Sequence, residues 1–174
     1  MISKFNSNFK YFIVFILING CGNYSFTGAS IPEGTESFQV NLFNNNAGNN
    51  VGSIFEPGLD RDFTIALQNI LENQTNLQMV QSNGDLLYEG EIVEYRVSPM
   101  TATADLNAAQ NRLSISVSVN FQNFKKEDEG FERRFSFYFD FPAEQQLISI
   151  KSEAHEIIFE RITQDIFNAS LAKW

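Results

Sequence analysis

Residues 113–121 have the sequence LSISVSVNF, in which apolar residues alternate strictly with serine or asparagine. Successive side chains of a β-strand point to opposite faces of the sheet, so this period of two predicts a strand with one apolar face and one polar face. The apolar face packs on a core, and the polar face meets water. The segment therefore predicts a sheet that is covered on one side only.

A second strand of the same kind follows after a charged turn. Phenylalanine alternates with polar residues through residues 134–141, which indicates a strand that returns beside the first one. Because the two strands share a core face, we expect Val117 and Phe137 to be buried. Ser116 and Tyr138 should lie on the opposite face.

The preceding apolar segment, residues 85–97, predicts a third strand. The phase of its apolar residues shifts around Gly90, which indicates a β-bulge or a point of close packing. Pro99 should end this strand, because proline donates no backbone hydrogen bond. Residues 100–111 are small, show no clear period and are expected to form a loop.

The remaining elements are an earlier strand and two helices. Residues 37–43 alternate and predict a strand, while the Asn-rich residues 44–50 predict a loop. The first helix has apolar residues at helical spacing: Leu59, Phe63, Ala66, Leu67, Ile70 and Leu71. The second, expected over residues 145–172, has a stripe formed by Ala154, Ile157, Ile158, Arg161, Ile162, Asp165, Ile166 and Ala169.

The order of these elements, β-α-β-β-β-α, predicts an α+β fold. We expect a two-layer sandwich in which two helices pack on one face of a four-stranded mixed sheet. The other sheet face should be polar and available for contact. One domain over residues 37–174 accounts for all of these elements.

Composition excludes several classes of protein. The chain has 174 residues, a formal charge of −9 and a pI near 4.5, which argues against a nucleic-acid partner. Its single cysteine excludes an internal disulfide, and its single histidine excludes an imidazole cluster for a transition metal. With 43% hydrophobic residues, the chain has the composition of a packed globular protein.

The N-terminus has the features of a secretory signal. Lys4 and Lys10 precede a short apolar run at residues 11–18, which is too short to span a bilayer. The following Ile18-Asn-Gly-Cys21 resembles the bacterial lipobox, in which the cysteine thiol is lipidated after cleavage. We therefore expect a signal peptide at residues 1–20 and a lipidated tether at residues 21–36.

Lipidation at Cys21 would hold the protein on a membrane without a transmembrane helix, because several acyl chains on one residue anchor stably. The alternative is that Cys21 is only the last residue of an ordinary signal. A secreted chain whose only cysteine lies at the signal boundary favours lipidation. The body of the protein is then expected to be soluble, tethered and extracytoplasmic.

No pattern in the sequence supports an enzyme, a cofactor or a metal site. His155 lies beside Glu153 and Glu156 without a nucleophile pattern around it, and a partly exposed histidine on a helix surface is the favoured interpretation. The acidic run at residues 127–129 lacks the spacing of a calcium-binding loop.

Several short segments together resemble the LptE family of lipopolysaccharide-assembly lipoproteins. They are the lipobox cysteine, YSFTG at residues 24–28, GDLLYEGEI at residues 84–92, Tyr95-x-Val-x-Pro99, and RLSISVSVNF at residues 112–121. The resemblance implies a lipid-anchored, periplasm-facing protein of the outer membrane. It also implies that the chain sits inside the LptD-like translocon barrel, assists its assembly, and touches lipopolysaccharide.

Two sets of residues are candidates for these contacts. A barrel lumen is polar, so the serine-rich face and a long loop should meet its wall, at Ser114, Ser116, Ser118 and Asn107. Lipopolysaccharide is anionic, and the only concentration of basic residues brackets the charged turn, at Lys125, Lys126, Arg133 and Arg134. The alternative for these four is a solvated turn.

Two other functions remain open from the sequence. One is a periplasm-facing lipoprotein that binds another envelope ligand. The other is a cell-surface lipoprotein, which the lack of an acidic stretch directly after Cys21 disfavours.

Overall fold

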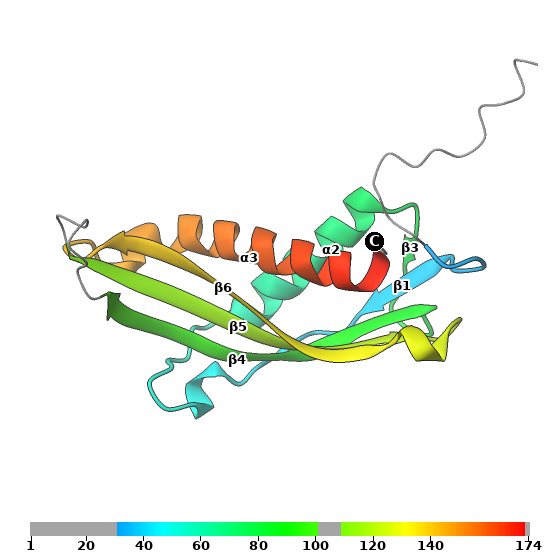
Figure 1. Cartoon of the computed structure of the whole chain (residues 1–174), viewed down its shortest axis with the longest axis horizontal. Helices are drawn as coiled ribbons and strands as arrows, with labels where there is room; N and C mark the ends of the chain where they lie inside the picture. Colours follow the sequence, from blue (N-terminus) through cyan, green and yellow to red (C-terminus); the bar gives the residue numbers. More distant parts are fainter. Residues whose placement is uncertain (1–30, 101–108, 173–174) are drawn as a thin grey trace, which may run out of the picture.

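A computed structural model describes residues 31–100 and 109–172 of the chain. In this part the chain forms a six-stranded mixed sheet with two α-helices on one of its faces (Figure 1). The elements are β1 (Ser37–Val40), β2 (Asn44–Asn45), α2 (Leu59–Gln74), β3 (Gln78–Met79), β4 (Leu86–Met100), β5 (Gln110–Asn123), β6 (Phe131–Pro142) and α3 (Leu147–Leu171), with single 3₁₀ turns η2 (Ala47–Asn49) and η3 (Glu127–Glu129). The α+β fold with both helices on one face is confirmed.

The expected number of four strands is wrong, because β2 and β3 were not foreseen. The strand order is β3-β1-β4-β5-β6, and β2 adds to β4 beyond the end of β1. β1 runs parallel to β3 and β4, whereas β4, β5 and β6 are antiparallel. β2 and β3 have two residues each, which is too short for alternation to be recognised in a sequence.

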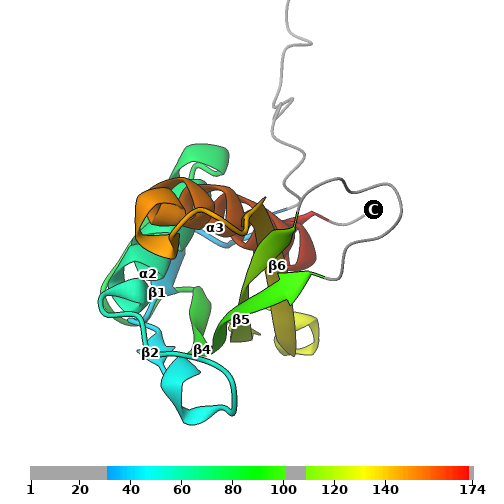
Figure 2. The same ribbon diagram turned by 90° about the vertical axis from the view of Figure 1, so that its left-hand side faces the viewer.

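Three long strands give the molecule its elongated shape. β4, β5 and β6 have 15, 14 and 12 residues, and at about 3.3 Å per residue such strands are roughly 40–50 Å long. The 25 residues of α3 run along the same axis above them (Figure 1). An end-on view shows α2 and α3 on one side of the sheet (Figure 2).

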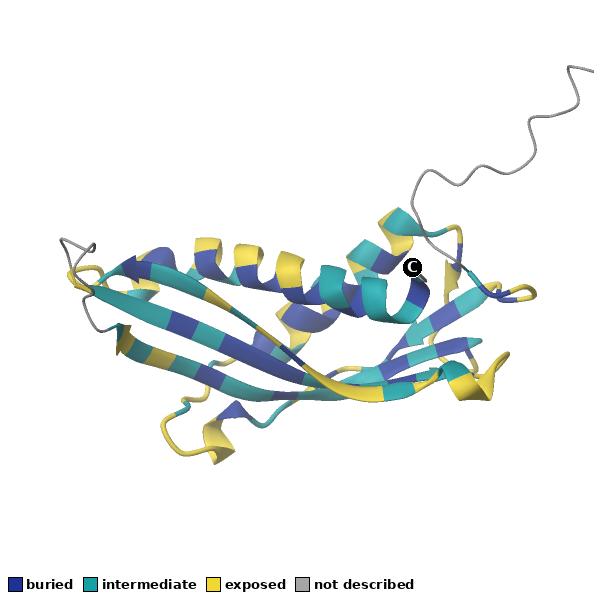
Figure 3. Ribbon diagram, in the orientation of Figure 1, coloured by how far each residue is buried: buried dark blue, intermediate teal, exposed yellow. Residues whose placement is uncertain are grey.

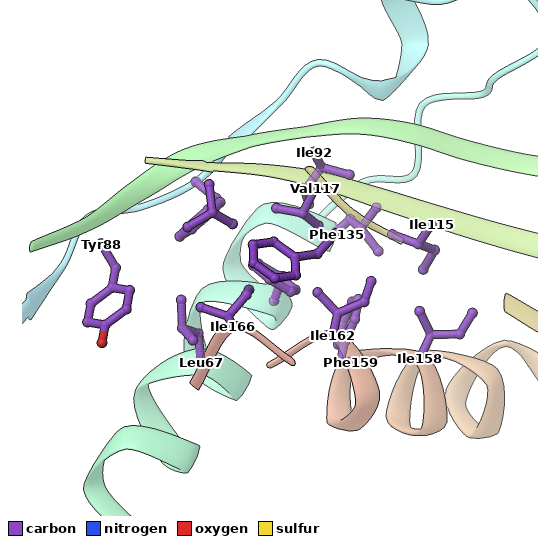
Figure 4. Packing of buried hydrophobic residues seen from close by; sticks show 14 of the residues in the cluster. Leu67, Tyr88, Ile92, Ile115, Val117, Phe135, Ile158, Phe159, Ile162 and Ile166 are labelled. Atoms are coloured by element: carbon purple, nitrogen blue, oxygen red, sulfur yellow. The ribbon is translucent and has the colours of Figure 1, made fainter. Parts of the chain in front are cut away.

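The core lies between the sheet and the helices. Ile115 and Val117 of β5 point toward Ile158, Ile162 and Ile166 of α3, and all five are buried (Figure 4). Burial of Val117 is therefore confirmed. Phe137 is only half-buried, because β6 is the edge strand of the sheet and lacks a neighbour on its outer side.

The expected stripe of α3 is only partly correct. Ala154, Ile158, Ile162 and Ile166 are buried, but Ile157 and Arg161 are exposed (Figure 3). Two phenylalanines outside the stripe, Phe159 and Phe167, are buried instead. The reason is that α3 packs against both the sheet and α2, so its buried surface is wider than one stripe.

In β4 the bulge and the close-packing point are two different residues. The register with β5 shifts between Ile92 and Glu94, which places the bulge at Val93. Gly90 is regularly paired, and a Cβ there would lie 2.0 Å from the Ser118 carbonyl oxygen. Gly90 is thus the expected close-packing point. Pro99 does not end the strand, because the outer side of β4 has no paired strand there and its missing N–H breaks no ladder.

The first strand is shorter than expected. β1 ends at Val40, after which Leu42 is exposed and Phe43 is buried. The change of direction lets Asn44 and Asn45, expected in a loop, pair with β4 as β2.

Asp85 joins the start of β1 to the start of β4 and to the β5–β6 turn. Its Oδ2 accepts hydrogen bonds from the backbone N–H of Glu36 (2.9 Å), and from the N–H (3.1 Å) and hydroxyl (3.0 Å) of Ser37. Its Oδ1 lies 3.0 Å from the Lys125 ammonium. The Glu36 N–H and Lys125 favour the charged form and lower the pKa of Asp85 to about 2.

Acid should therefore remove the stabilisation that Asp85 provides. The pKa is lower in the folded chain than in the unfolded chain, so the contribution is fully present above about pH 4 and is lost as the pH falls toward 2. We expect Asp85→Asn to lower the urea midpoint at pH 6, and the difference from the wild type to shrink below pH 3. A constant difference from pH 6 to pH 2.5 would contradict this role.

Candidate functional site

The sheet face opposite the helices, here called the open face, carries the polar side chains of the three long strands. Its members by register are Glu89, Glu91, Glu94 and Arg96 of β4; Arg112, Ser114, Ser116, Ser118 and Asn120 of β5; and Glu132, Arg134, Ser136, Tyr138 and Asp140 of β6. The expected polar face is therefore present, and no helix of the described residues covers it (Figure 2).

The bulge at Val93 decides which residues of β4 reach the open face. Before the bulge Glu91 faces outward and Ile92 is buried, in line with Ser118 and Val117 of β5. One extra residue shifts the alternation, so Glu94 then lies beside Ser116 on the open face.

Glu94 is the centre of a network on this face. Its Oε2 accepts hydrogen bonds from the Ser116 hydroxyl (2.8 Å) and from Arg134 (2.7 Å), and its Oε1 lies 3.1 Å from Arg96 Nε. Ser136 in turn donates to the Ser116 hydroxyl at 2.8 Å. The network joins β4, β5 and β6 by side chains as well as by the backbone ladder.

The expectation that Ser116 is accessible on a wet face is wrong. Its side chain does lie on the open face, but it is 1% exposed, because Glu94, Arg134 and Ser136 surround it. Ser114 and Ser118 are half-buried. A molecule that docks here would meet the charged side chains and Tyr138 before it met the serines.

Tyr138 is the exposed aromatic residue of the open face. The Arg112 guanidinium lies 3.5 Å from the centre of its ring. The same guanidinium donates two hydrogen bonds to the Asp140 carboxylate, at 2.7 and 2.8 Å. The Asp140 carboxylate raises the pKa of Arg112 through these bonds. The stacked guanidinium restrains the orientation of the tyrosine ring, which is 44% exposed.

Two shallow hollows lie on the open face. One, of about 280 Å³, is lined by Glu94, Ser114, Arg134 and Tyr138, together with Ser116, Ser136 and Phe137. The other, of about 430 Å³, is lined mainly by polar residues, among them Glu89, Glu91, Asn120 and Glu132. Within the described residues no group of side chains could hold a metal ion. The geometry suits contact with a polar surface.

The four basic residues around the turn do not form one cluster. Lys125 pairs with Asp85, Lys126 lies 3.4 Å from Glu129, and Arg134 pairs with Glu94 on the open face. Arg133 is on the opposite face, next to the rings of Phe131 and Phe135.

Two predicted site residues, Cys21 and Asn107, lie outside the described residues. Among the residues that are described, no helix has the length and apolar character needed to cross a membrane.

His155 has the surroundings of a structural residue. Its ring packs between Tyr95 and Phe159, and Nε2 lies 3.1 Å from the Tyr95 hydroxyl. Burial lowers the pKa of His155, so the neutral ring is favoured. The partly exposed helix residue expected from the sequence is confirmed.

Sequence reasoning missed two features of this region. Glu94 was not singled out, because its role depends on the bulge and on residues 20 to 40 positions away. The exposed apolar residues at positions 51–55 were missed as well, although three of five are apolar in a segment between a polar loop and a helix.

Comparisons with known proteins agree with this fold. A family model described as LptE, lipopolysaccharide-assembly, matches residues 35–170. No curated protein matches the sequence.

Solved structures provide further similarities. The hypothetical protein CT253 from Chlamydia trachomatis has a TM-score of 0.52 at 9% identity, over 80% of this chain and 99% of that one. Protein XCC0632 from Xanthomonas campestris also has a TM-score of 0.52, at 8% identity, over 78% and 83%. A minor lipoprotein from Acinetobacter baumannii is 15% identical over 80% and 98%, with a TM-score of 0.49. At these identities, the first two comparisons show a shared fold.

Proposed function

Since the chain belongs to the LptE family of lipopolysaccharide-assembly proteins, we propose that it is an outer-membrane lipoprotein that binds and plugs an LptD-like β-barrel. In this role it assists assembly of the barrel and lipopolysaccharide transport. The function is one of binding and not of catalysis, in keeping with a family that has no catalytic role.

The observation that carries the proposal is the open face. Side-chain hydrogen bonds of Glu94, Arg134 and the Arg112–Asp140 pair connect neighbouring strands on this face, so the face presents a rigid polar surface. The inner wall of a large barrel is also polar, and polar surfaces of this kind associate through hydrogen bonds and bridging water. The exposed ring of Tyr138 adds the kind of aromatic contact that is enriched in protein interfaces.

The proposal includes lipid attachment at Cys21 and a periplasm-facing position. The described chain begins at Ile31, ten residues after Cys21, and ten residues reach at most about 35 Å. The folded body therefore stays close to the membrane that holds the acyl chains, where the barrel also lies.

The placement of the basic residues favours a protein partner over lipopolysaccharide as the main contact of the turn. Three of the four cations are paired with carboxylates, and Arg133 and Arg134 are on opposite sheet faces. Direct lipopolysaccharide contact at Lys125, Lys126, Arg133 and Arg134 stays a prediction.

Co-purification tests the proposal. The lipidated chain, solubilised from its own cells in mild detergent, should retain a large outer-membrane β-barrel in a fixed ratio. Ser136→Arg places a bulky charge on the open face and should reduce barrel recovery at least about tenfold, the effect of some 1.4 kcal/mol. The matched control is Ser152→Arg on the exposed side of α3, which should leave barrel recovery unchanged. The melting temperatures of both variants show whether either change affects the fold.

If the wild-type chain is lipidated and correctly localised but retains no barrel, the proposal is wrong. The periplasmic binding module for another envelope ligand is then the better explanation.

A further inference from the structure

The segment before α2 exposes an unusual amount of apolar surface. Within residues 50–56, here called the apolar loop, Val51 is 96% exposed, Ile54 49% and Phe55 61%. Scattered single apolar residues are normal on a surface, but three within five positions form a local patch.

The apolar loop is held in one conformation by bonds to β4. The Ile54 N–H donates to the Tyr95 carbonyl at 2.9 Å, and the Ser53 hydroxyl bonds both the N–H (2.7 Å) and the carbonyl (3.1 Å) of Tyr95. The Asn50 side chain donates to the Val93 carbonyl. The exposure of the apolar side chains is therefore a property of an ordered backbone.

The ends of the loop are fixed too. The Glu56 carbonyl accepts a hydrogen bond from the Asn45 side chain at 2.7 Å, and the Glu56 carboxylate lies 2.8 Å from Lys151 of α3. Gly48 leaves room for Phe55, since a Cβ at Gly48 would lie 3.0 Å from the Phe55 Cβ.

The apolar loop borders the open face. Arg96, a member of that face, donates to the Val51 carbonyl at 3.1 Å. Figures 1 and 2 both show the segment around η2 on the side of the sheet away from the helices. A partner that covers the open face would meet the apolar loop at its margin.

The charge of the adjoining surface argues against a bilayer as the occupant of the loop. The open face beside it carries Glu89, Glu91 and Glu132 around one hollow, and the anionic headgroups of a bacterial membrane repel such a surface.

The size of the patch argues against a second copy of the chain. A stable dimer buries about 800 Å² on each partner, and three side chains supply only a fraction of that area. Interfaces between different proteins combine apolar contacts with polar ones, so an apolar segment beside a larger polar surface fits such an interface.

We propose that the apolar loop anchors the protein partner of the open face, with Val51, Ile54 and Phe55 entering an apolar pocket on that partner. This inference rests on the proposed function and identifies the surface that gives the complex its affinity. The polar residues of the open face then provide orientation and a wet, hydrogen-bonded contact.

The test compares two triple variants in the same co-purification. Val51→Ser/Ile54→Ser/Phe55→Ser should lower barrel recovery at least about tenfold and leave the melting temperature unchanged. The matched control, Ile65→Ser/Ile148→Ser/Ile157→Ser, also removes three exposed apolar side chains, all from the helices, and should retain the barrel. If the triple loop variant folds poorly, Phe55→Ser alone should still reduce recovery severalfold.

The outcomes separate the two proposals. Absence of the barrel from the wild-type preparation contradicts the proposed function. Equal recovery with the wild type and the loop variant overturns the inference only. It is also overturned if the loop variant keeps the barrel but loses binding to vesicles of phosphatidylethanolamine and phosphatidylglycerol, or loses self-association in sedimentation.

Discussion

Serine in place of Cys21 should abolish incorporation of labelled fatty acid into the chain. The hydroxyl of serine is a far weaker nucleophile than a thiol, so the step that forms the thioether to diacylglycerol fails. Without its acyl chains the protein loses the energy of membrane binding, about 0.8 kcal/mol for each buried CH₂. We expect an uncleaved precursor or a soluble species, with the outer-membrane fraction depleted at least tenfold, as about 1.4 kcal/mol already achieves.

Metabolic labelling and membrane fractionation measure both effects. Ser25→Ala, four residues later, is the control and should be labelled as strongly as the wild type. Since the chain has no other cysteine, any label that persists in Cys21→Ser would show that this lipidation site is wrong.

Truncation of Phe63 should produce a large loss of stability. Phe63 of α2 is fully buried, and the centre of its ring lies 5.1 Å from that of Phe43 and 5.5 Å from that of Phe159, both in edge-to-face geometry. These contacts join α2 and α3 to the segment between β1 and β2. Phe63→Ala leaves a cavity at this junction and should lower the free energy of unfolding by about 3–5 kcal/mol.

Urea unfolding followed by circular dichroism measures this loss. The control is Phe55→Ala, which removes the same ring from the exposed apolar loop and should change stability by less than about 0.5 kcal/mol. The two variants differ in what they affect: Phe55→Ala should lower barrel recovery without a loss of stability, whereas Phe63→Ala should lower stability. Equal loss of stability in both variants would contradict this core.

Part of the candidate site could be predicted from the sequence. The alternation in residues 113–121 predicts a polar face, and the structure has one at Ser114 and Ser118. The alternation does not predict which polar side chains are accessible. Ser116 is buried because Glu94 and Arg134 come from neighbouring strands and cover it.

For the basic turn, too, the sequence did not predict where the side chains lie. Lys125, Lys126, Arg133 and Arg134 lie close together in the sequence, but strand geometry separates them. Consecutive residues of β6 point to opposite faces, so Arg133 contacts phenylalanine rings while Arg134 joins the network of Glu94.

Local patterns were sufficient for the two helices, the three long strands and the one-sided packing of the sheet. The reason is that the period of apolar residues, two in a strand and 3.6 in a helix, is a property of neighbouring residues along the chain. The same holds for the resemblance to the LptE family, which rests on short segments and is confirmed by the match over residues 35–170.

The other features of the fold depend on contacts between segments that are distant in the sequence. β2 and β3 exist because β4 and β1 offer backbone partners, and the bulge at Val93 is visible only in the pairing of β4 with β5. The apolar loop owes its fixed shape to Tyr95 and Val93, about 40 residues away. Such bonds form between groups that the fold brings together, and no period in the sequence encodes them.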